Sequence, residues 1–181
     1  GLFLGIDFGT TNSVVSIFDF KDGEVQTIPI DGSNIFPTAI QFETDIEDET
    51  KLSKIFGVQA KEAAMIYPQS TILSIKRFLG TDENILINVD DKEFSFKPEQ
   101  IAGEIMGYLK RMADEYAREK LNITGEFSGC VITVPANSTD KQKKMTKEAA
   151  VLAGFDEDSV YLRLEPAAAA IRYAVNERKD K

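Results

Sequence analysis

Apolar residues in the first thirty positions fall into three short runs separated by polar turns. Residues 2–6 are almost entirely apolar, which predicts a strand buried on both faces. Residues 13–20 form a second apolar run. The Lys-Asp-Gly sequence at 21–23 is typical of a hairpin turn, and the alternating run at 24–30 follows it. The pattern therefore predicts an antiparallel meander of three strands.

Shorter and less regular segments follow this meander. They are bounded by turn and breaker residues, and a helical pattern among them stops before Pro68. We expect an extended run at 37–43, an acidic solvated loop at 43–49, a helix at 58–67, an apolar segment at 70–80, and a hairpin built from 85–89 and 93–96.

The most regular helical pattern of the chain runs from Pro98 to Leu121. Gly103 and Gly107 form a G-x-x-x-G pair inside it, and charged residues on both sides argue against a membrane helix. The two glycines are therefore expected to allow another element to pack closely. One apolar stripe at helical spacing contains Ile101, Ile105, Tyr108, Leu109, Met112 and Tyr116.

Strands and helices alternate in the last third of the chain. Residues 129–134 predict a buried strand that contains Cys130 as a small core residue. A strand at 160–164 and a last helix opened by Pro166 are also expected. Between the two strands, a helix is predicted to start with a capping box, end at a glycine and bury one stripe. The capping box is Thr139 and Gln142, the glycine is Gly154, and the stripe is Met145, Ala149 and Leu152.

Composition narrows the range of functions. The 181 residues carry a net charge of −9, which argues against a nucleic-acid partner because phosphates require a basic face. No run approaches the roughly 20 apolar residues of a membrane span, so no membrane partner is expected. A single cysteine and no evident signal peptide favour the cytoplasm, with an organelle as the alternative. The sequence has no histidine, which rules out Ser-His-Asp and Cys-His catalysis and imidazole metal sites.

The stretch GIDFGTTNS, residues 5–13, combines a carboxylate with a tight polar turn. Gly9 is expected to adopt backbone angles closed to other residues and to let a ligand approach. Backbone N–H groups and the hydroxyls of Thr10 and Thr11 can bind an anion. Asp7 would repel a bare anion, so its position indicates a divalent cation between it and phosphates. The stretch predicts a magnesium-nucleotide site, and the alternative is a hairpin turn capped by Asp7. It is not a Walker-type loop, which needs a G-x-x-x-x-G-K pattern and a following helix.

Two further charged positions could complete such a site. Lys76 and Arg77 interrupt an apolar segment, and a lysine near the turn would stabilise charge on a transferring phosphoryl group. Glu165 precedes Pro166 at a helix start, which favours its ionised form, and it could hold a magnesium-bound water. The alternatives are surface cations on a helix and a solvent-facing end cap.

Six segments, in order along the chain, resemble the nucleotide-binding domain of the heat-shock protein 70 family, the DnaK-type chaperones. The resemblance implies an α/β, actin-like ATPase (ribonuclease-H-like) lobe, with a mixed five-stranded sheet flanked by helices. It implies a core subdomain of residues 1–36 and 98–181, and a smaller inserted α+β subdomain of residues 37–97. The segments are GIDFGTTNSVVSI, FPTAIQF, STILSIKRFLG, VITVPA, TDKQKKMTKEAAVLAG and EPAAAAIRYAV.

The resemblance also implies roles for single residues around ATP or ADP, Mg²⁺ and a K⁺ ion. Asp7 would face the ions, Lys76 would contact the γ-phosphate and the attacking water, and Glu165 would position a magnesium-bound water. These three would be the catalytic residues, and Asp7 and Glu165 the metal-binding ones. The residues expected to hold the β- and γ-phosphates are Gly9, Thr10, Thr11 and Asn12.

Pro135 resembles the switch proline of the family, and Lys143 stands where the family usually has a sensing arginine. Together they would form an allosteric relay, although lysine lacks the planar fork of arginine. Further departures lie on the same relay and partner side rather than on the phosphate turn. Asn137 and Ser138 replace an aromatic pair, Leu164 replaces an asparagine, and Ala167 replaces a threonine.

The family has a second lobe with its own glycine-rich phosphate loop, and no second loop occurs in this sequence. The chain is therefore expected to be the first lobe, inactive alone, paired with the second lobe of its own domain. A J-domain co-chaperone is an expected partner, and client peptides would be reached only through a C-terminal domain. Two alternatives stay open. One is an Hsp70-like regulatory protein that does not hydrolyse nucleotide. The other is a sugar kinase of the same superfold, although Lys76, Arg77 and the VITVPA segment favour the chaperone.

Overall fold

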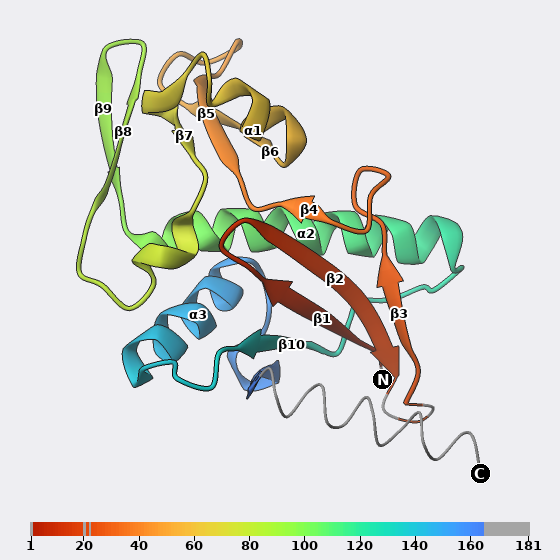
Figure 1. The fold of residues 1–181 in the computed structure, drawn as a ribbon. Coiled ribbons are helices and arrows are strands. Elements are labelled where there is room, and N and C mark those ends of the chain that lie inside the picture. Colours follow the sequence, from red (N-terminus) through yellow and green to blue (C-terminus); the bar gives the residue numbers. More distant parts are fainter. Residues whose placement is uncertain (1, 20, 22, 165–181) are drawn as a thin grey trace.

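The computed structural model describes residues 2–19, 21 and 23–164, and Figure 1 shows a mixed sheet lying beside one long helix. The sheet order is β11-β10-β1-β2-β3, and the two-residue strand β4 (Phe36–Pro37) also pairs with β2. The expected meander and mixed five-stranded sheet are confirmed, with β4 as a sixth strand. The five strands are β1 (Leu2–Phe8), β2 (Asn12–Asp19), β3 (Val25–Ile28), β10 (Gly129–Val134) and β11 (Val160–Leu164).

Strand β1 lies at the centre of this sheet. It runs parallel to β10 and antiparallel to β2. Leu4 and Ile6 are fully buried on one face, whereas the other face is only partly covered, by contacts such as the stacked Phe3 and Phe18 rings at 5.8 Å. The prediction that residues 2–6 are buried on both faces is therefore too strong, since one face carries most of the burial.

Helices α2 (Pro98–Lys120) and α3 (Asp140–Leu152) pack against each other, and the glycines of α2 make this possible. A Cβ at Gly103 would lie 3.0 Å from the carbonyl oxygen of Ala149 and 2.9 Å from Cβ of Leu152. The close packing expected of this glycine is confirmed. A short 3₁₀ helix, η3 (Glu157–Ser159), joins α3 to β11.

The predicted start of α3 is confirmed, and one residue of its predicted inner stripe is wrong. Thr139 Oγ1 accepts a hydrogen bond from the backbone N–H of Gln142, whose side chain accepts one from the N–H of Thr139. Met145 and Ala149 are buried, but Leu152 is 59% exposed. Leu152 is the last residue of α3, and its Cβ lies close to Gly103 of α2.

The segment between β4 and α2 forms two small sheets and short helices. Strands β5, β6 and β7 form one sheet, and β8 and β9 form a hairpin. All the predicted runs appear; β8 has the predicted bounds, and the others differ at one or both ends. The elements are β5 (Ile40–Thr44), β6 (Leu52–Phe56), α1 (Val58–Ala63), η1 (Pro68–Ser70), β7 (Thr71–Ile72), η2 (Ile75–Phe78), β8 (Ile85–Val89) and β9 (Lys92–Phe96).

Two predictions in this segment need correction. The helix expected at 58–67 ends at Ala63, because Met65, Ile66 and Tyr67 are exposed and give a longer helix no apolar face to bury. The acidic loop starts after Thr44, since the strand pairing of β5 extends to that residue. Lys76 lies in a 3₁₀ helix of four residues, inside the apolar segment expected at 70–80.

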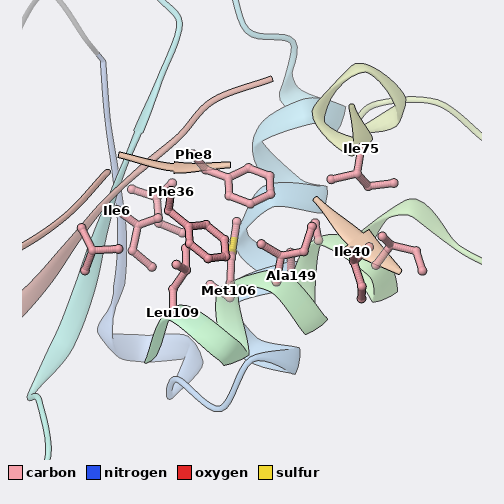
Figure 2. Close-up of a cluster of buried hydrophobic side chains, with 14 of the residues drawn as sticks. Ile6, Phe8, Phe36, Ile40, Ile75, Met106, Leu109 and Ala149 are labelled. Atoms are coloured by element: carbon pink, nitrogen blue, oxygen red, sulfur yellow. The ribbon is translucent and has the colours of Figure 1, made fainter. Parts of the chain in front are cut away.

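Buried side chains from the central sheet, α2, α3 and the 40–96 segment join one hydrophobic cluster (Figure 2). Tyr108 of α2 contributes at its margin, where its ring stacks on Phe56 at 4.5 Å and lies 5.7 Å from Phe36. The division into residues 1–36 with 98–181 and residues 37–97 stays a prediction. Glu165 and the helix expected from Pro166 lie outside the described residues.

Candidate functional site

The candidate site lies at the edge of the central sheet where three parallel strands end. Strands β1, β10 and β11 are parallel, so Asp7 near the end of β1 lies beside Thr133 near the end of β10. The Asp7 side chain is exposed, and its Oδ1 accepts a hydrogen bond of 3.3 Å from Oγ1 of Thr133. Our reading of the sequence did not single out Thr133. Its signal was a hydroxyl inside the apolar VITV run.

The turn after β1 needs a glycine because the chain folds tightly onto itself. A Cβ at Gly9 would lie 2.1 Å from the carbonyl oxygen of Asn12, a distance that no side chain can tolerate. Gly9 does not have a positive φ, so a left-handed backbone conformation, one of the unusual conformations that glycine allows, does not explain why this turn has a glycine. Glycine is required here by close approach of the backbone.

Two hydrogen bonds hold this turn against the segment that enters β5. The backbone N–H of Thr38 donates to the carbonyl oxygen of Thr11 at 2.9 Å. The hydroxyls of Ser13 and Thr38 are 2.7 Å apart, and both residues are buried. Because a buried hydroxyl needs a partner, this pair fixes β2 to the chain at Thr38. The sequence did not predict this pair. The one sign of it in the sequence was that each residue is polar and stands next to an apolar run.

The polar side chains of the turn remain available for a ligand. Thr11 and Asn12 are exposed and Thr10 is half-buried. Within the part of the chain that the structure describes, the hydroxyls of Thr10 and Thr11 and the amide of Asn12 make no hydrogen bond. Donors left free beside an exposed carboxylate are suited to binding an anion that carries its own cation.

Lys76 lies on η2, which the protein core fixes on both sides of the lysine. Ile75 is fully buried, and Figure 2 shows it in the same cluster as Phe8, the residue before the Gly9 turn. Phe8 and Ile75 therefore anchor the turn and the lysine segment to one core. Among the described residues no hydrogen bond or ion pair joins Lys76 to Asp7 or to residues 9–12.

A sulfur contact and a glycine hold the end of this segment against α3. The N–H of Gly80 lies 3.1 Å from Sδ of Met145, and Gly80 has a φ of 95°. A Cβ at Gly80 would lie 2.3 Å from Cγ of Gln142. The lysine segment is therefore held beside the first turns of α3.

The predicted relay residues lie on the connection between β10 and α3. Pro135 directly follows β10 at the same sheet edge as Asp7, and its carbonyl oxygen accepts a 3.0 Å hydrogen bond from the N–H of Ser138. Lys143 is half-buried on α3, next to the Gln142 that contacts Gly80. Nothing in this geometry tests a relay. Glu165 lies outside the described residues, so its predicted role is also untested.

The ligand set favours magnesium over a metal held by protein alone. No group of three or more histidine, cysteine, aspartate or glutamate residues that could hold a metal occurs among residues 2–19, 21 and 23–164. Mg²⁺ usually keeps several waters and is bound by one or two carboxylates together with substrate phosphates. A single exposed carboxylate at Asp7, beside free hydroxyl donors, fits that requirement.

Three other observations concern the chain outside this site. Burial raises the pKa of the Cys130 thiol to about 12, so Cys130 is a core residue and not a nucleophile, as the sequence predicted. None of the helices found in the described residues is apolar and long enough to span a bilayer. Cavities of about 730 Å³ and 240 Å³ both lie away from the Gly9 turn.

Comparison with known proteins identifies the family of the chain. The family model for the Hsp70 protein matches residues 3–181, and the chain belongs to the Hsp70 family. The actin-like ATPase fold predicted from the sequence is thereby confirmed.

Among curated proteins, the chain is 39% identical to the "Chaperone protein DnaK" of Thermotoga neapolitana over 177 residues. It is 38% identical to the proteins of the same name from Thermotoga petrophila and Thermotoga maritima. Each match covers 96% of this chain and 26% of the relative, so the chain spans about a quarter of their length.

Proposed function

We propose that this chain supplies the first phosphate-binding element of the ATPase domain of a DnaK-type chaperone, which hydrolyses ATP to ADP and phosphate as a full-length protein. The observation that carries the proposal is the pairing of Asp7 and Thr133 at the ends of three parallel strands, next to the hydroxyls of the Gly9 turn, which make no hydrogen bond within the described residues. The proposal includes a core of residues 1–36 and 98–181 and an inserted subdomain of residues 37–97.

The turn binds the β- and γ-phosphates in this proposal. Thr10, Thr11 and Asn12 donate hydrogen bonds from their side chains, and the missing side chain of Gly9 keeps the turn narrow. Asp7 would hold Mg²⁺ directly or through water, and its carboxylate would also face the K⁺ ion. A bound Mg²⁺ offsets the charge that repels a carboxylate from phosphate oxygens.

Lys76 and Glu165 complete the proposed site. Lys76 donates to the γ-phosphate and to the attacking water, and its ammonium stabilises charge in the transition state. This role of Lys76 is supported by one buried cluster, which contains both Ile75, the residue before Lys76, and Phe8, the residue before Gly9. Glu165, which lies outside the described residues, is the next residue in the sequence after β11 and would position a magnesium-bound water.

The proposal also names partners and a location. The chain pairs with a second lobe of its own nucleotide-binding domain, works with a J-domain co-chaperone, and acts on client peptides through a C-terminal domain. Pro135 and Lys143 pass the nucleotide state towards that domain. The protein acts in the cytoplasm.

Single-turnover hydrolysis of ATP by the full-length protein tests the proposal. We expect hydrolysis that depends on Mg²⁺ and that Asp7→Asn strongly reduces. The matched control is Asp158→Asn, which changes an exposed aspartate in η3, before β11 begins. Equal rates in both variants would contradict the role of Asp7.

The same experiment separates the two alternatives. Nucleotide binding without turnover would favour a non-hydrolysing regulatory protein. That alternative rests on the departures from the family pattern near Pro135, where lysine stands at position 143 in place of the usual arginine. Phosphate transfer to a small sugar would indicate a sugar kinase.

A further inference from the structure

A cavity of about 730 Å³ runs along one side of β5, remote from the Gly9 turn. Four consecutive residues of β5, from Gln41 to Thr44, line it. Successive side chains of a strand point to opposite faces, so four in a row can line one cavity only if it follows the edge of the strand. Residues 66–70, in and before η1, and residues 88–91 of the β8–β9 hairpin form its other walls.

The edge of β5 that faces this cavity is open over its second half. On one side, β6 pairs with β5 along its whole length, from Ile40 to Thr44. On the other side, β7 pairs only with Ile40 and Gln41. Residues in an antiparallel strand direct their N–H and C=O groups to alternate sides. Within Phe42–Thr44 at least one residue therefore directs both groups at the open side, where no strand of the described residues pairs with them.

A buried polar side chain also lines this cavity. Gln41 is only 2% exposed, yet its amide makes no hydrogen bond within the described part of the chain. The amide is not enclosed by protein atoms, so Gln41 offers a donor and an acceptor to whatever occupies the cavity.

The charges around the cavity all have one sign. Its lining contains Glu43, Asp90 and Asp91 and no lysine or arginine. Asp90 and Asp91 form the two-residue turn of the hairpin, with φ values of 50° and 63° that are typical of a type I′ turn. The hydroxyl of Thr44 donates to Asp90, which ties the hairpin tip to β5. Asp90 is therefore held in place beside the open edge, and Glu43 and Asp91 lie next to it in the cavity lining.

Apolar groups at the cavity suit a peptide better than a simple ion. Ile66 and Tyr67 line it and are 73% and 53% exposed. Phe42 is buried and stacks on Phe96 at 5.3 Å, which fixes the strand from behind. A volume of this size is within the range of ligand sites, and it combines backbone groups, apolar contacts and negative charge.

We propose that this cavity docks an extended, basic segment of a partner protein, which adds as a strand to the open edge at Phe42–Thr44. Main-chain hydrogen bonds along β5 give affinity, as in other cases of strand addition. Lysine or arginine side chains of the partner lie against Glu43, Asp90 and Asp91, and alternate apolar side chains contact Ile66 and Tyr67. This site is separate from the proposed nucleotide site.

Fluorescence anisotropy with labelled seven-residue peptides tests the proposal on the 181-residue chain. A peptide that alternates lysine and valine is expected to bind with a Kd of roughly 10–100 µM. A peptide that alternates glutamate and valine, and a lysine–valine peptide with methylated backbone nitrogens, are each expected to bind about tenfold more weakly. Equal affinity for the acidic peptide would overturn the charge argument, and equal affinity for the methylated peptide would overturn strand addition.

Charge variants locate the binding on this surface. The double variant Glu43→Gln with Asp91→Asn is expected to raise the Kd of the lysine–valine peptide about fivefold or more. The control Glu62→Gln with Asp158→Asn makes the same change of charge at exposed positions that do not line the cavity, and it should bind as the parent does. Equal weakening in both variants would overturn the site.

Two other occupants are outcomes of the same test. Spermidine that binds as tightly as the lysine–valine peptide would show a site for small cations and overturn strand addition. Sedimentation velocity reports the second case. Self-association that the peptide abolishes would show that the edge pairs with a second copy of the chain, and this would also overturn the proposal.

Discussion

Two sheet edges in this molecule carry carboxylates, and they differ in what surrounds the charge. Asp7 lies at the ends of parallel strands, next to hydroxyl donors that have no partner in the described residues. Glu43, Asp90 and Asp91 lie along the side of a strand, next to open backbone groups and exposed apolar side chains. The comparison shows that the groups around an acidic residue decide which ligand it can bind. The first edge suits a phosphate with its cation, and the second suits a basic peptide.

The largest expected effect would separate the two edges by activity. Lys76→Ala in the full-length protein should lower single-turnover ATP hydrolysis roughly 10² to 10³-fold, because it removes one positioned transition-state donor. The lysine–valine peptide should bind this variant unchanged, since Lys76 does not line the β5 cavity. An unchanged rate of hydrolysis would remove Lys76 from the mechanism.

A second variant tests whether the first edge depends on a narrow turn. Gly9→Ala places a Cβ against the carbonyl oxygen of Asn12, so the turn must open. We expect a loss of about 2–3 kcal/mol in the free energy of unfolding, measured by urea titration, together with weaker nucleotide binding. Gly107→Ala is the control, because its nearest atom is the flexible end of Arg111 at 3.4 Å and alanine favours a helix. Equal stability of Gly9→Ala and the parent would contradict the steric argument.

A third variant tests the link between the edges, because Thr38 contacts the turn and lies two residues before β5. Thr38→Val should cost about 1–3 kcal/mol by leaving the buried Ser13 hydroxyl without its partner. Adding Ser13→Ala should recover part of that loss, since both polar groups are then gone. Urea unfolding of the single and double variants measures the recovery, and strictly additive losses would show that the hydroxyls are independent.

The smallest expected effect concerns Tyr108, which supports the sheet of the second edge through Phe56. Its hydroxyl donates to both carboxylate oxygens of Asp31, at 3.0 and 2.8 Å. Burial and this hydrogen bond raise the pKa of Tyr108 to about 12. The unfolded chain ionises near pH 10, so this contribution to stability is complete below pH 10 and is lost as the pH rises from about 10 to 12.

Tyr108→Phe should therefore cost on the order of 1 kcal/mol at neutral pH, since the contact is partly exposed. It should also reduce the fall in stability above pH 10. Thermal unfolding of the parent and of the variant between pH 8 and 12 measures both effects. A variant with the same alkaline slope as the parent would show that another group titrates there.

The sequence predicted the regular elements and the chemical character of the first edge. Hydrophobic periodicity located the strands of the central sheet and α2, and a capping box located the start of α3, because these signals are local in the chain. Asp7 and the turn stood out as polar residues between apolar runs. Thr133 and Thr38 did not, since their partners lie 126 and 25 residues away in sequence and only the folded sheet brings them together.

The second edge could not be predicted for the same reason. Whether Phe42–Thr44 has a neighbour on both sides depends on how far β7 extends, and β7 stops pairing after two residues. The exposed Met65, Ile66 and Tyr67 had an apolar pattern that fitted a longer helix. Tertiary packing decided both where the pairing of β7 stops and where α1 ends, and no local sequence pattern reports tertiary packing.

The sulfur of Met145 gives the chain a chemical weak point. Its thioether accepts a hydrogen bond from the N–H of Gly80, which holds the segment that carries Lys76 against α3. Methionine sulfoxide carries an extra oxygen and is polar, so oxidation of Met145, which is 7% exposed, would add an atom to a packed contact. Faster hydrogen exchange at the Gly80 amide after peroxide treatment would report that the contact had loosened.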